Sequence, residues 1–393
     1  MKYNFDKIVK RGKTCSVKWD FVDERFNCSG LLPMWVADMD FEAPRPVIDA
    51  ILKRAGQGVF GYTAPEPSYY EAIINWFSKR HNWKIDRDWI VFTPGVVPAI
   101  SMLIQTFTEP GDGVIIQKPV YYPFMRTIKM NGRIIVNNPL TLNSSRYHMD
   151  IDGLEKTIKE TAAKIMILCS PHNPVGRAWT ADELTRFGEI CLKNKVLVIS
   201  DEIHCDLMLN GSDHIPFASI SNEFLMNSIT CTAPSKTFNL AGLQTSNIII
   251  ADPEKRKLFR KNIDKNALGS PNAFGAIALE AAYNNGGDWL RQVLKYIEGN
   301  LDYLNNFINK KIPEVKVIEP DATYLVWLDF RGLGLGRESL IDLLRNKAKV
   351  ALDEGYIFGK TEGDGFARMN IACPRKILRE GLSRIGNAVK SLD

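Results

Sequence analysis

Seven short apolar runs recur through the middle of the chain, and they constrain the fold more than any other feature. The runs are WIVFT, GVIIQ, RIIVN, KIMILCS, VLVIS, SITCT and SNIII, which begin at residues 89, 113, 133, 164, 196, 228 and 246. Amphipathic segments lie between several of them, a pattern typical of strand–helix–strand crossovers. Because the runs are continuously apolar rather than alternating, we expect strands buried on both faces of a mostly parallel sheet.

The chain has 393 residues, too many for one ordinary core, so we expect more than one domain. Residues 1–45 lack periodicity and are expected to form an arm that packs against the small domain. The apolar runs place a large domain at 46–287. From 288 to 393, a long helical pattern, the strand-like TYLVWLDF and a final strand and helix predict a smaller α+β domain. The predicted fold class is α/β, with helices flanking the central sheet.

Composition and charge exclude several classes of protein. The net charge of +5 is small for this length and no five basic residues adjoin, so nucleic acid is not an expected partner. No apolar stretch reaches the length of a membrane span, and the start MKYNFDKIVKRGK lacks the apolar region of a secretory leader. The seven cysteines, an odd number without a Cys-x-x-Cys pair, favour reduced thiols, and we expect a cytoplasmic protein.

Ligands of open parallel sheets bind beyond the carboxyl ends of the strands, so the residues after each run are the candidates for chemistry. After WIVFT, Gly95, Val96 and Val97 form a glycine turn opening a helix, whose free N–H groups suit an anion such as phosphate. An ordinary strand–helix turn explains the same residues. After GVIIQ, Tyr121 or its neighbour Tyr122 can stack on a flat ring, or either can be a core tyrosine.

Three further runs are followed by polar side chains. Asn173 lies in a Pro-rich turn, where its amide either binds a ligand or caps the turn. Asp201 ends a buried strand and needs a cationic or hydrogen-bonding partner, and His204 lies three residues further on. Lys236 follows SITCT in uncharged surroundings, where a lysine is more often a snorkelling side chain than a catalyst.

One hypothesis explains all five strand ends together, namely a site for pyridoxal phosphate (PLP). The phosphate needs N–H groups, the ring an aromatic face, the pyridine nitrogen a carboxylate, the phenolic oxygen a donor and the aldehyde a lysine. The glycine-rich GLGLG at 332–336 is a weaker rival, because a dinucleotide-binding motif needs its third glycine where Arg337 stands. No metal site is predicted, because the five histidines form no His-x-x-x-His pair and the cysteines lack zinc spacing.

Four motifs carry a resemblance over nearly the full chain, and they occur in the order SPHNPVG, SDEIH, SKTFNLAG and ARMNIACPR. With them the chain resembles the fold type I PLP-dependent enzymes, the aminotransferase class I/II superfamily. The segments PMWVADMDFEAP at 33–44 and GVFGYT at 58–63 are similar to the cystathionine β-lyase group of the MalY/PatB type. The resemblance implies a PLP-dependent transferase fold of type I and PLP as the cofactor.

The resemblance also implies a role for each strand-end residue. Lys236 is similar to the Schiff-base lysine, and Asp201 to the acid that pairs with the pyridine nitrogen. Asn173 matches the residue that hydrogen-bonds the phenolic oxygen, and Tyr121 the aromatic residue that stacks on the ring. Those expected at the phosphate are Gly95, Val96 and Val97, joined by Ser235 or Thr232.

Three further residues are implied to contact the substrate or the cofactor. Tyr62 is similar to a tyrosine that reaches the phosphate from the partner subunit, which implies a homodimer. Arg368 matches the arginine that binds the substrate α-carboxylate, a task suited to a planar guanidinium. Ala37, in the N-terminal motif, is expected beside the substrate.

The resemblance implies a carbon–sulfur β-lyase that cleaves cystathionine or cysteine S-conjugates to a thiol, pyruvate and ammonia. Where transaminases often have Asp-x-x-Tyr, this chain has Asp201-Glu-Ile-His204, which favours the lyase group; His204 either donates to the phenolic oxygen or packs. An aminotransferase acting on an amino acid and a 2-oxo acid uses the same site and remains an alternative, as does a regulatory protein without activity. The expected ligand is a small amino acid.

Overall fold

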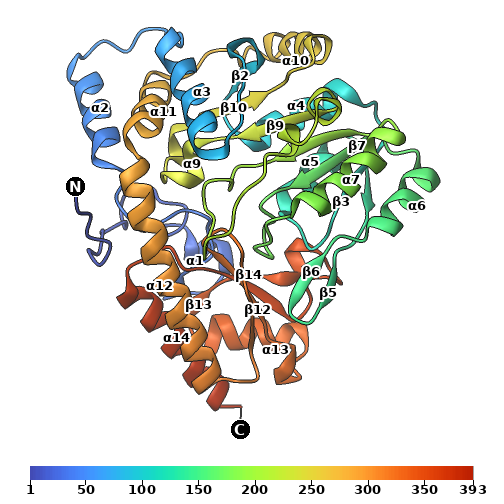
Figure 1. Cartoon of the computed structure of the whole chain (residues 1–393). Coiled ribbons are helices and arrows are strands. Elements are labelled where there is room, and N and C mark those ends of the chain that lie inside the picture. The colour runs from blue at the N-terminus through green and yellow to red at the C-terminus, as the bar shows by residue number, and fades with distance from the viewer. Residues whose placement is uncertain (393) are drawn as a thin grey trace.

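The computed structural model describes residues 1–392, and its centre is a seven-stranded sheet (Figure 1). The strands are β2 (Ile90–Thr93), β3 (Gly113–Ile116), β4 (Ile134–Asn137), β7 (Ile165–Cys169), β8 (Leu197–Asp201), β9 (Ser228–Thr232) and β10 (Ser246–Ile249), in the order β2-β10-β9-β8-β7-β3-β4. Only β10 runs antiparallel to its neighbours, and the other pairs are parallel. Each of the seven apolar runs is therefore a strand of one mostly parallel sheet, which confirms the predicted fold class.

Helices cover both faces of this sheet, as its continuously apolar strands require. One face packs against α4 (Val96–Phe107), α5 (Tyr122–Met130) and α10 (Pro253–Lys265). The other packs against α6 (Ile151–Thr161), α7 (Ala181–Lys193) and α8 (Asn222–Met226). Successive residues of one strand belong to different cores, because side chains alternate along a strand: Val114 and Ile116 contact the first group, and Ile115 the second.

A second helical layer lies beside the β2–β10 edge. It comprises α2 (Arg45–Gly56), α3 (Pro67–His81) and α11 (Ala273–Asn285). The long helix α12 (Gly287–Lys311), drawn in orange in Figure 1, runs from this layer along the C-terminal part of the chain. Buried residues of α3, α11, α12 and the N-terminal segment share one apolar core.

The C-terminal part is built on a smaller antiparallel sheet of order β11-β12-β15-β14. Its strands are β11 (Lys316–Ile318), β12 (Leu325–Asp329), β14 (Asp353–Glu354) and β15 (Phe366–Asn370), and its helices are α13 (Arg337–Asp342), a π-helical turn (Leu343–Lys347) and α14 (Arg375–Lys390). The GLGLG segment lies between β12 and α13. Because β12 has only antiparallel partners, it does not form the parallel unit that a dinucleotide motif requires.

The N-terminal segment joins this C-terminal part through β1 (Leu32–Pro33), which pairs in parallel with β13 (Val350–Ala351). Phe5 packs edge-on against Phe41 and Trp289 with ring centroids 5.1 Å and 5.9 Å away. We propose that residues 1–45 are the arm of a small domain spanning 288–393, whose first residues belong to α12.

The remaining elements are short. They are α1 (Val22–Phe26), α9 (Pro234–Thr237), the hairpin β5 (Thr141–Asn143) and β6 (Arg146–His148), and the 3-10 turns Arg87–Trp89, Phe217–Ser219, Ala241–Leu243, Arg331–Leu333 and Gly355–Phe358. Within residues 1–392, no helix combines the length and apolar character needed to cross a membrane.

Candidate active site

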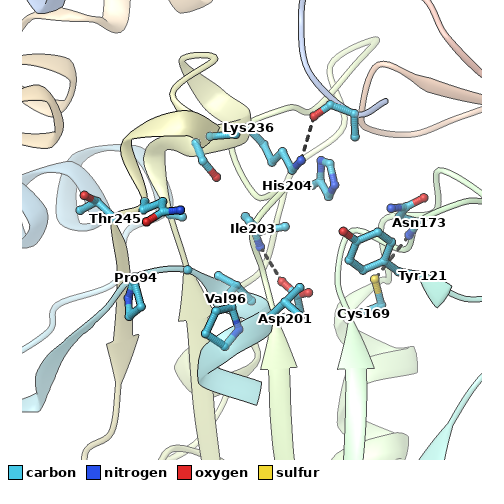
Figure 2. A pocket seen from close by; sticks show the side chains of 18 residues that line it. Pro94, Val96, Tyr121, Cys169, Asn173, Asp201, Ile203, His204, Lys236 and Thr245 are labelled. Carbon is cyan, nitrogen blue, oxygen red and sulfur yellow. Dashed lines mark hydrogen bonds between the residues drawn. The ribbon is translucent and has the colours of Figure 1, made fainter. Parts of the chain in front are cut away.

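A cavity of about 180 Å³ opens beyond the carboxyl ends of β7, β8 and β9 (Figure 2). Ligands of open parallel sheets bind at this place, beyond the carboxyl ends of the strands. Ten residues selected from the sequence line it: Ala37, Gly95, Val96, Val97, Tyr121, Asn173, Asp201, His204, Ser235 and Lys236. The topology brings them together, because the chain leaves each of these neighbouring strands at the same edge.

Lys236 reaches into the cavity from α9, the single helical turn that follows β9. Its Nζ donates a hydrogen bond of 2.8 Å to the carbonyl oxygen of Ala37. Burial, together with the positive charge of Arg368, lowers the pKa of Lys236 to about 8, although Asp38 and Asp201 act in the opposite direction. Near neutral pH a much larger fraction of this amine is therefore neutral than of an ordinary lysine, and the neutral form is the one that acts as a nucleophile or base.

Asp201, the last residue of β8, lies at the floor of the cavity. Its Oδ1 accepts one hydrogen bond, from the backbone N–H of Ile203 at 3.2 Å. Burial raises the pKa of Asp201 to about 7, even though the hydrogen bond from Ile203 and the nearby charge of Lys236 both act to lower it. A carboxylate that is buried away from water to this extent requires a cationic partner. A protonated pyridine nitrogen can be that partner.

Tyr121 and Tyr122 are separated by the structure. The ring of Tyr121 lines the cavity and packs edge-on against Phe124 at 5.6 Å. Tyr122 begins α5 and contacts Phe358 instead, at 5.7 Å. Burial raises the pKa of the Tyr121 hydroxyl, so the ring stays neutral and offers an uncharged face for stacking.

Asn173 links the cavity to Arg368. Its Oδ1 accepts a hydrogen bond of 2.8 Å from Arg368 Nη1, which leaves its amide nitrogen as the donor toward the cavity. Arg368, on β15, is buried directly behind Asn173 and does not itself line the cavity. Its Nη2 donates to the carbonyl of Trp35 and to the carboxylate of Asp353, and its guanidinium lies 4.9 Å from the Phe358 ring.

His204 lines the cavity next to Lys236, and the ring of Tyr324 lies 6.3 Å away. The Nδ1 atom of His204 is buried and has no hydrogen-bond partner among the residues that the structure describes. Burial lowers the pKa of His204 well below its ordinary value, with Lys236 and Arg368 adding to the effect. The imidazole is therefore neutral and can donate or accept one hydrogen bond to a ligand.

Two residues expected at the cofactor phosphate lie elsewhere in the single chain. Thr232 lies in β9 with its hydroxyl donating to the carbonyl of Asn247 at 3.3 Å, so of these two residues Ser235 lines the cavity and Thr232 does not. Tyr62 is fully exposed in the segment before α3, and it lines a surface groove with Phe60 and Phe274.

The cavity also contains residues that the sequence reasoning missed. They are Pro94, Pro98, Cys169, Ile203, Ala233, Ala241, Gln244 and Thr245. Gln244 and Thr245 precede β10, and because β10 is antiparallel, its beginning lies at the edge where the parallel strands end. If the strand SNIII is taken as antiparallel, the residues before it, and not those after it, are the candidates, and these are Gln244 and Thr245.

These residues fit PLP. The first N–H groups of α4, at Val96 and Val97, have no partner within the helix and lie at its positive end, where a phosphate binds. Beside them lie the Ser235 hydroxyl, the Tyr121 ring, the Asp201 carboxyl, which has no cationic hydrogen-bond partner among the described residues, and the Lys236 amine. A phosphate, a flat ring, a ring nitrogen and an aldehyde thus each meet a complementary group.

The comparisons with known proteins agree with this chemistry. The family model "Aminotransferase class I and II" matches residues 31–385. The chain is 47% identical to the cystathionine beta-lyase PatB of Bacillus subtilis (strain 168), over 98% of this chain and 100% of the relative.

Two solved structures with bound PLP are similar along their whole length. One, from Clostridium difficile 630, is described only as a "putative aminotransferase"; it has a TM-score of 0.97 and 47% identity, and the match covers 99% of this chain and 100% of that one. The other is cystalysin from Treponema denticola, with a TM-score of 0.97, 41% identity and 100% of both chains covered. The chain therefore belongs to the aminotransferase class I and II family, and it is a PLP-dependent enzyme.

Proposed function

We propose that the protein is a carbon–sulfur β-lyase that cleaves cystathionine or cysteine S-conjugates into a thiol, pyruvate and ammonia. The observation that carries the proposal is the presence, in one cavity, of an amine whose pKa burial lowers and a carboxyl group without a cationic partner, Lys236 and Asp201. The 47% identity to a cystathionine beta-lyase supports the choice of reaction.

In this mechanism Lys236 would hold the cofactor through its Nζ, and it would be free to act as a base once a substrate amine is bound. Its neutral Nζ then removes the proton from the substrate α-carbon. PLP, when bound, stabilises the negative charge that develops on that carbon. Asp201 keeps a proton on the pyridine nitrogen, and the neutral Tyr121 ring holds the cofactor plane.

Breaking the bond between the β-carbon and sulfur completes the elimination. The electron pair of the α-carbon forms the new double bond, and the sulfur leaves with the pair of the broken bond as a thiolate. The remaining three-carbon fragment takes up water and yields pyruvate and ammonia. With cystathionine, the balance is one water consumed for one homocysteine, one pyruvate and one ammonia.

Arg368 binds the substrate α-carboxylate in this proposal. Its present partners, the Asn173 amide oxygen and the Trp35 carbonyl, hold the guanidinium plane behind the cavity. A substrate carboxylate beside Asn173 extends this set of hydrogen bonds. Such a fixed planar donor pair orients the α-hydrogen toward Lys236.

A homodimer with Tyr62 contributed by one copy to the cavity of the other completes the proposed site. Tyr62, Val59 and Phe60 are large side chains exposed on one segment. Covering them in a second copy removes apolar surface from water, and the Tyr62 hydroxyl becomes a donor to the phosphate. We place the enzyme in the cytoplasm, where its seven free cysteines stay reduced.

A direct assay tests the reaction. Purified enzyme is supplied with cystathionine, and pyruvate and free thiol are measured together with amino transfer to added 2-oxo acids. We expect equal amounts of thiol and pyruvate, and no activity in the Lys236→Ala variant. Transfer of the amino group to a 2-oxo acid without thiol release would instead establish the aminotransferase, which the similar chain from Clostridium difficile keeps as the second candidate.

A further inference from the structure

A buried polar cluster adjoins the cavity from behind, and the mechanism above does not use it. Its centre is Asp206, which is 2% exposed. Trp76 Nε1 donates to both carboxylate oxygens of Asp206, at 3.1 Å and 3.2 Å. Arg80 Nε lies 3.0 Å and His81 Nε2 2.9 Å from Oδ1, so the C-terminal end of α3 is fastened to this carboxylate.

The remaining contact of Asp206 connects it to the site. The hydroxyl of Thr237 donates to Asp206 Oδ2 at 2.8 Å, and both groups are buried. Thr237 directly follows Lys236 in α9, so the two side chains leave one helical turn in different directions. Lys236 enters the cavity (Figure 2), and the Thr237 hydroxyl points back to the Asp206 carboxylate.

The helix α9 has only four residues, and a single turn is not stable in isolation. Its orientation is therefore set by what it packs against. Phe238, the next residue, contacts Trp76 at 5.4 Å, and the bond from Thr237 to Asp206 lies on the same side. The charged Asp206 carboxylate is thus one of the groups that set the rotation of the turn that carries Lys236.

The same cluster extends to the other side of the site. His81 packs edge-on against His214 at 5.5 Å, and His214 lies 2.8 Å from Glu202, the residue that follows Asp201. The two residues with proposed chemistry, Asp201 and Lys236, are therefore each followed by a residue anchored in this cluster.

A metal site is the rival interpretation of the cluster, because ligand atoms of His81, Cys205 and Asp206 lie within 4.8 Å of one another. The contacts of Asp206 argue against it. A metal ion would have to displace the Arg80 guanidinium and the donors from Trp76 and Thr237. Burial raises the pKa of the Cys205 thiol well above its ordinary value, so this ligand stays protonated.

We propose that Asp206 is a positioning residue, which holds the Lys236 amine in place through the Thr237 hydroxyl. The proposal rests on the function proposed for Lys236. It requires the hydroxyl and not merely the bulk of Thr237, and this distinguishes it from a role in packing.

Two matched substitutions test it. Thr237→Val keeps the shape of the side chain and removes the hydroxyl, whereas Thr237→Ser keeps the hydroxyl. The full chain is freed of PLP and reloaded, and the rate of covalent attachment is followed by the visible absorbance band. We expect Thr237→Val to be slower by about tenfold, the effect of one hydrogen bond to a charged acceptor, and Thr237→Ser to stay near wild type.

Steady-state kinetics supply a second measurement. We expect Thr237→Val to lower kcat by a similar factor with KM nearly unchanged, and to increase the rate difference between α-protio and α-deuterio substrate, since proton removal by Lys236 becomes slower. Circular dichroism checks that both variants are folded. Asp206→Asn is expected to behave as Thr237→Val, and if it does not fold, the threonine pair decides alone.

The outcomes separate this inference from the proposed function. Attachment and kcat of Thr237→Val within about twofold of wild type, or equal losses in Thr237→Val and Thr237→Ser, would overturn the positioning role and leave the lyase proposal intact. Borohydride fixing the cofactor equally well in Lys236→Ala would instead overturn the role of Lys236 itself.

Discussion

The Lys236 amine donates its hydrogen bond to the backbone carbonyl of Ala37, 199 residues earlier in the chain, at 2.8 Å. The same carbonyl accepts a hydrogen bond of 3.0 Å from the Tyr324 hydroxyl. The hydrogen-bond acceptor of the Lys236 amine is therefore a neutral carbonyl oxygen and not a carboxylate. Burial is not offset by an ion pair, and the pKa of Lys236 stays low.

The first prediction concerns the pH dependence of cofactor attachment. Because only the neutral amine attacks an aldehyde and the pKa of Lys236 is lowered to about 8, the rate at which PLP-free enzyme binds PLP covalently should rise with pH below about 8 and level off above it. Stopped-flow absorbance measures this rate. A rise that continues toward pH 10 would indicate an ordinary lysine.

The second prediction concerns the stability of the chain without PLP. Burial raises the pKa of Asp201 from 3.8 to about 7. Between these two pH values the folded state therefore keeps a proton on Asp201 that the unfolded state has lost. The contribution of Asp201 to stability is thus fully present below about pH 4 and is lost as the pH rises through about 7. Asp201→Asn, which never ionises, should raise the Tm of PLP-free enzyme at pH 8 and change it little at pH 4.

Differential scanning calorimetry of both PLP-free proteins across this pH range makes the comparison. The difference between variant and wild type isolates Asp201, because all other groups titrate in both. With PLP bound, the Tm of the Asp201→Asn variant should instead be lower than that of the wild type, since its amide provides no negative charge for the ring nitrogen. For the same reason, the kcat of the variant should fall steeply. A Tm difference independent of pH would contradict the assignment.

The third prediction concerns substrate binding. Arg368→Lys keeps the charge but loses the planar pair of donors, so KM for amino acid substrates should rise by about tenfold or more while PLP content stays unchanged. Initial-rate kinetics and the visible absorbance band give the two quantities. Arg331→Lys is a matched control, because Arg331 pairs with Asp329 at the surface. Equal KM values for the wild type, Arg368→Lys and Arg331→Lys would show that Arg368 does not bind the substrate.

The fourth prediction concerns the dimer. If Tyr62 of one copy serves the cavity that holds Lys236 of the other, then Tyr62→Ala and Lys236→Ala are defects in different parts of each composite site. Mixing the two inactive variants and letting subunits exchange should restore activity to about a quarter of the sites, as random pairing gives. Light scattering measures the oligomeric state alongside. A monomer, or mixing without recovery, would contradict the shared site.

The parallel part of the sheet and its chemistry could be predicted because both depend on local sequence. A buried parallel strand is continuously apolar, and the residue after it lies at the ligand edge, which was enough to select Asn173, Asp201 and Lys236. The same rule missed Gln244 and Thr245, because it assumes a direction that β10 does not have.

Other features depend on contacts that no local pattern contains. Thr232 lies at a strand end, but the alternation of side chains directs its hydroxyl to Asn247. Asp353, the partner of Arg368, belongs to a two-residue strand without apolar periodicity. The cluster around Asp206 joins α3 to a loop 125 residues later, a pairing that only the folded chain establishes.

The pairing of β1 with β13 has a consequence for how the protein is made. Leu32 meets Val350 there, and the segment that follows β1 supplies Ala37 to the wall of the cavity. A growing chain emerges from the ribosome with its N-terminal segment first, yet strand β1 in that segment has no strand to pair with until synthesis has passed residue 350. The enzyme therefore completes its site only at the end of translation, and chains released early expose an open cavity and an unpaired strand to proteases and chaperones.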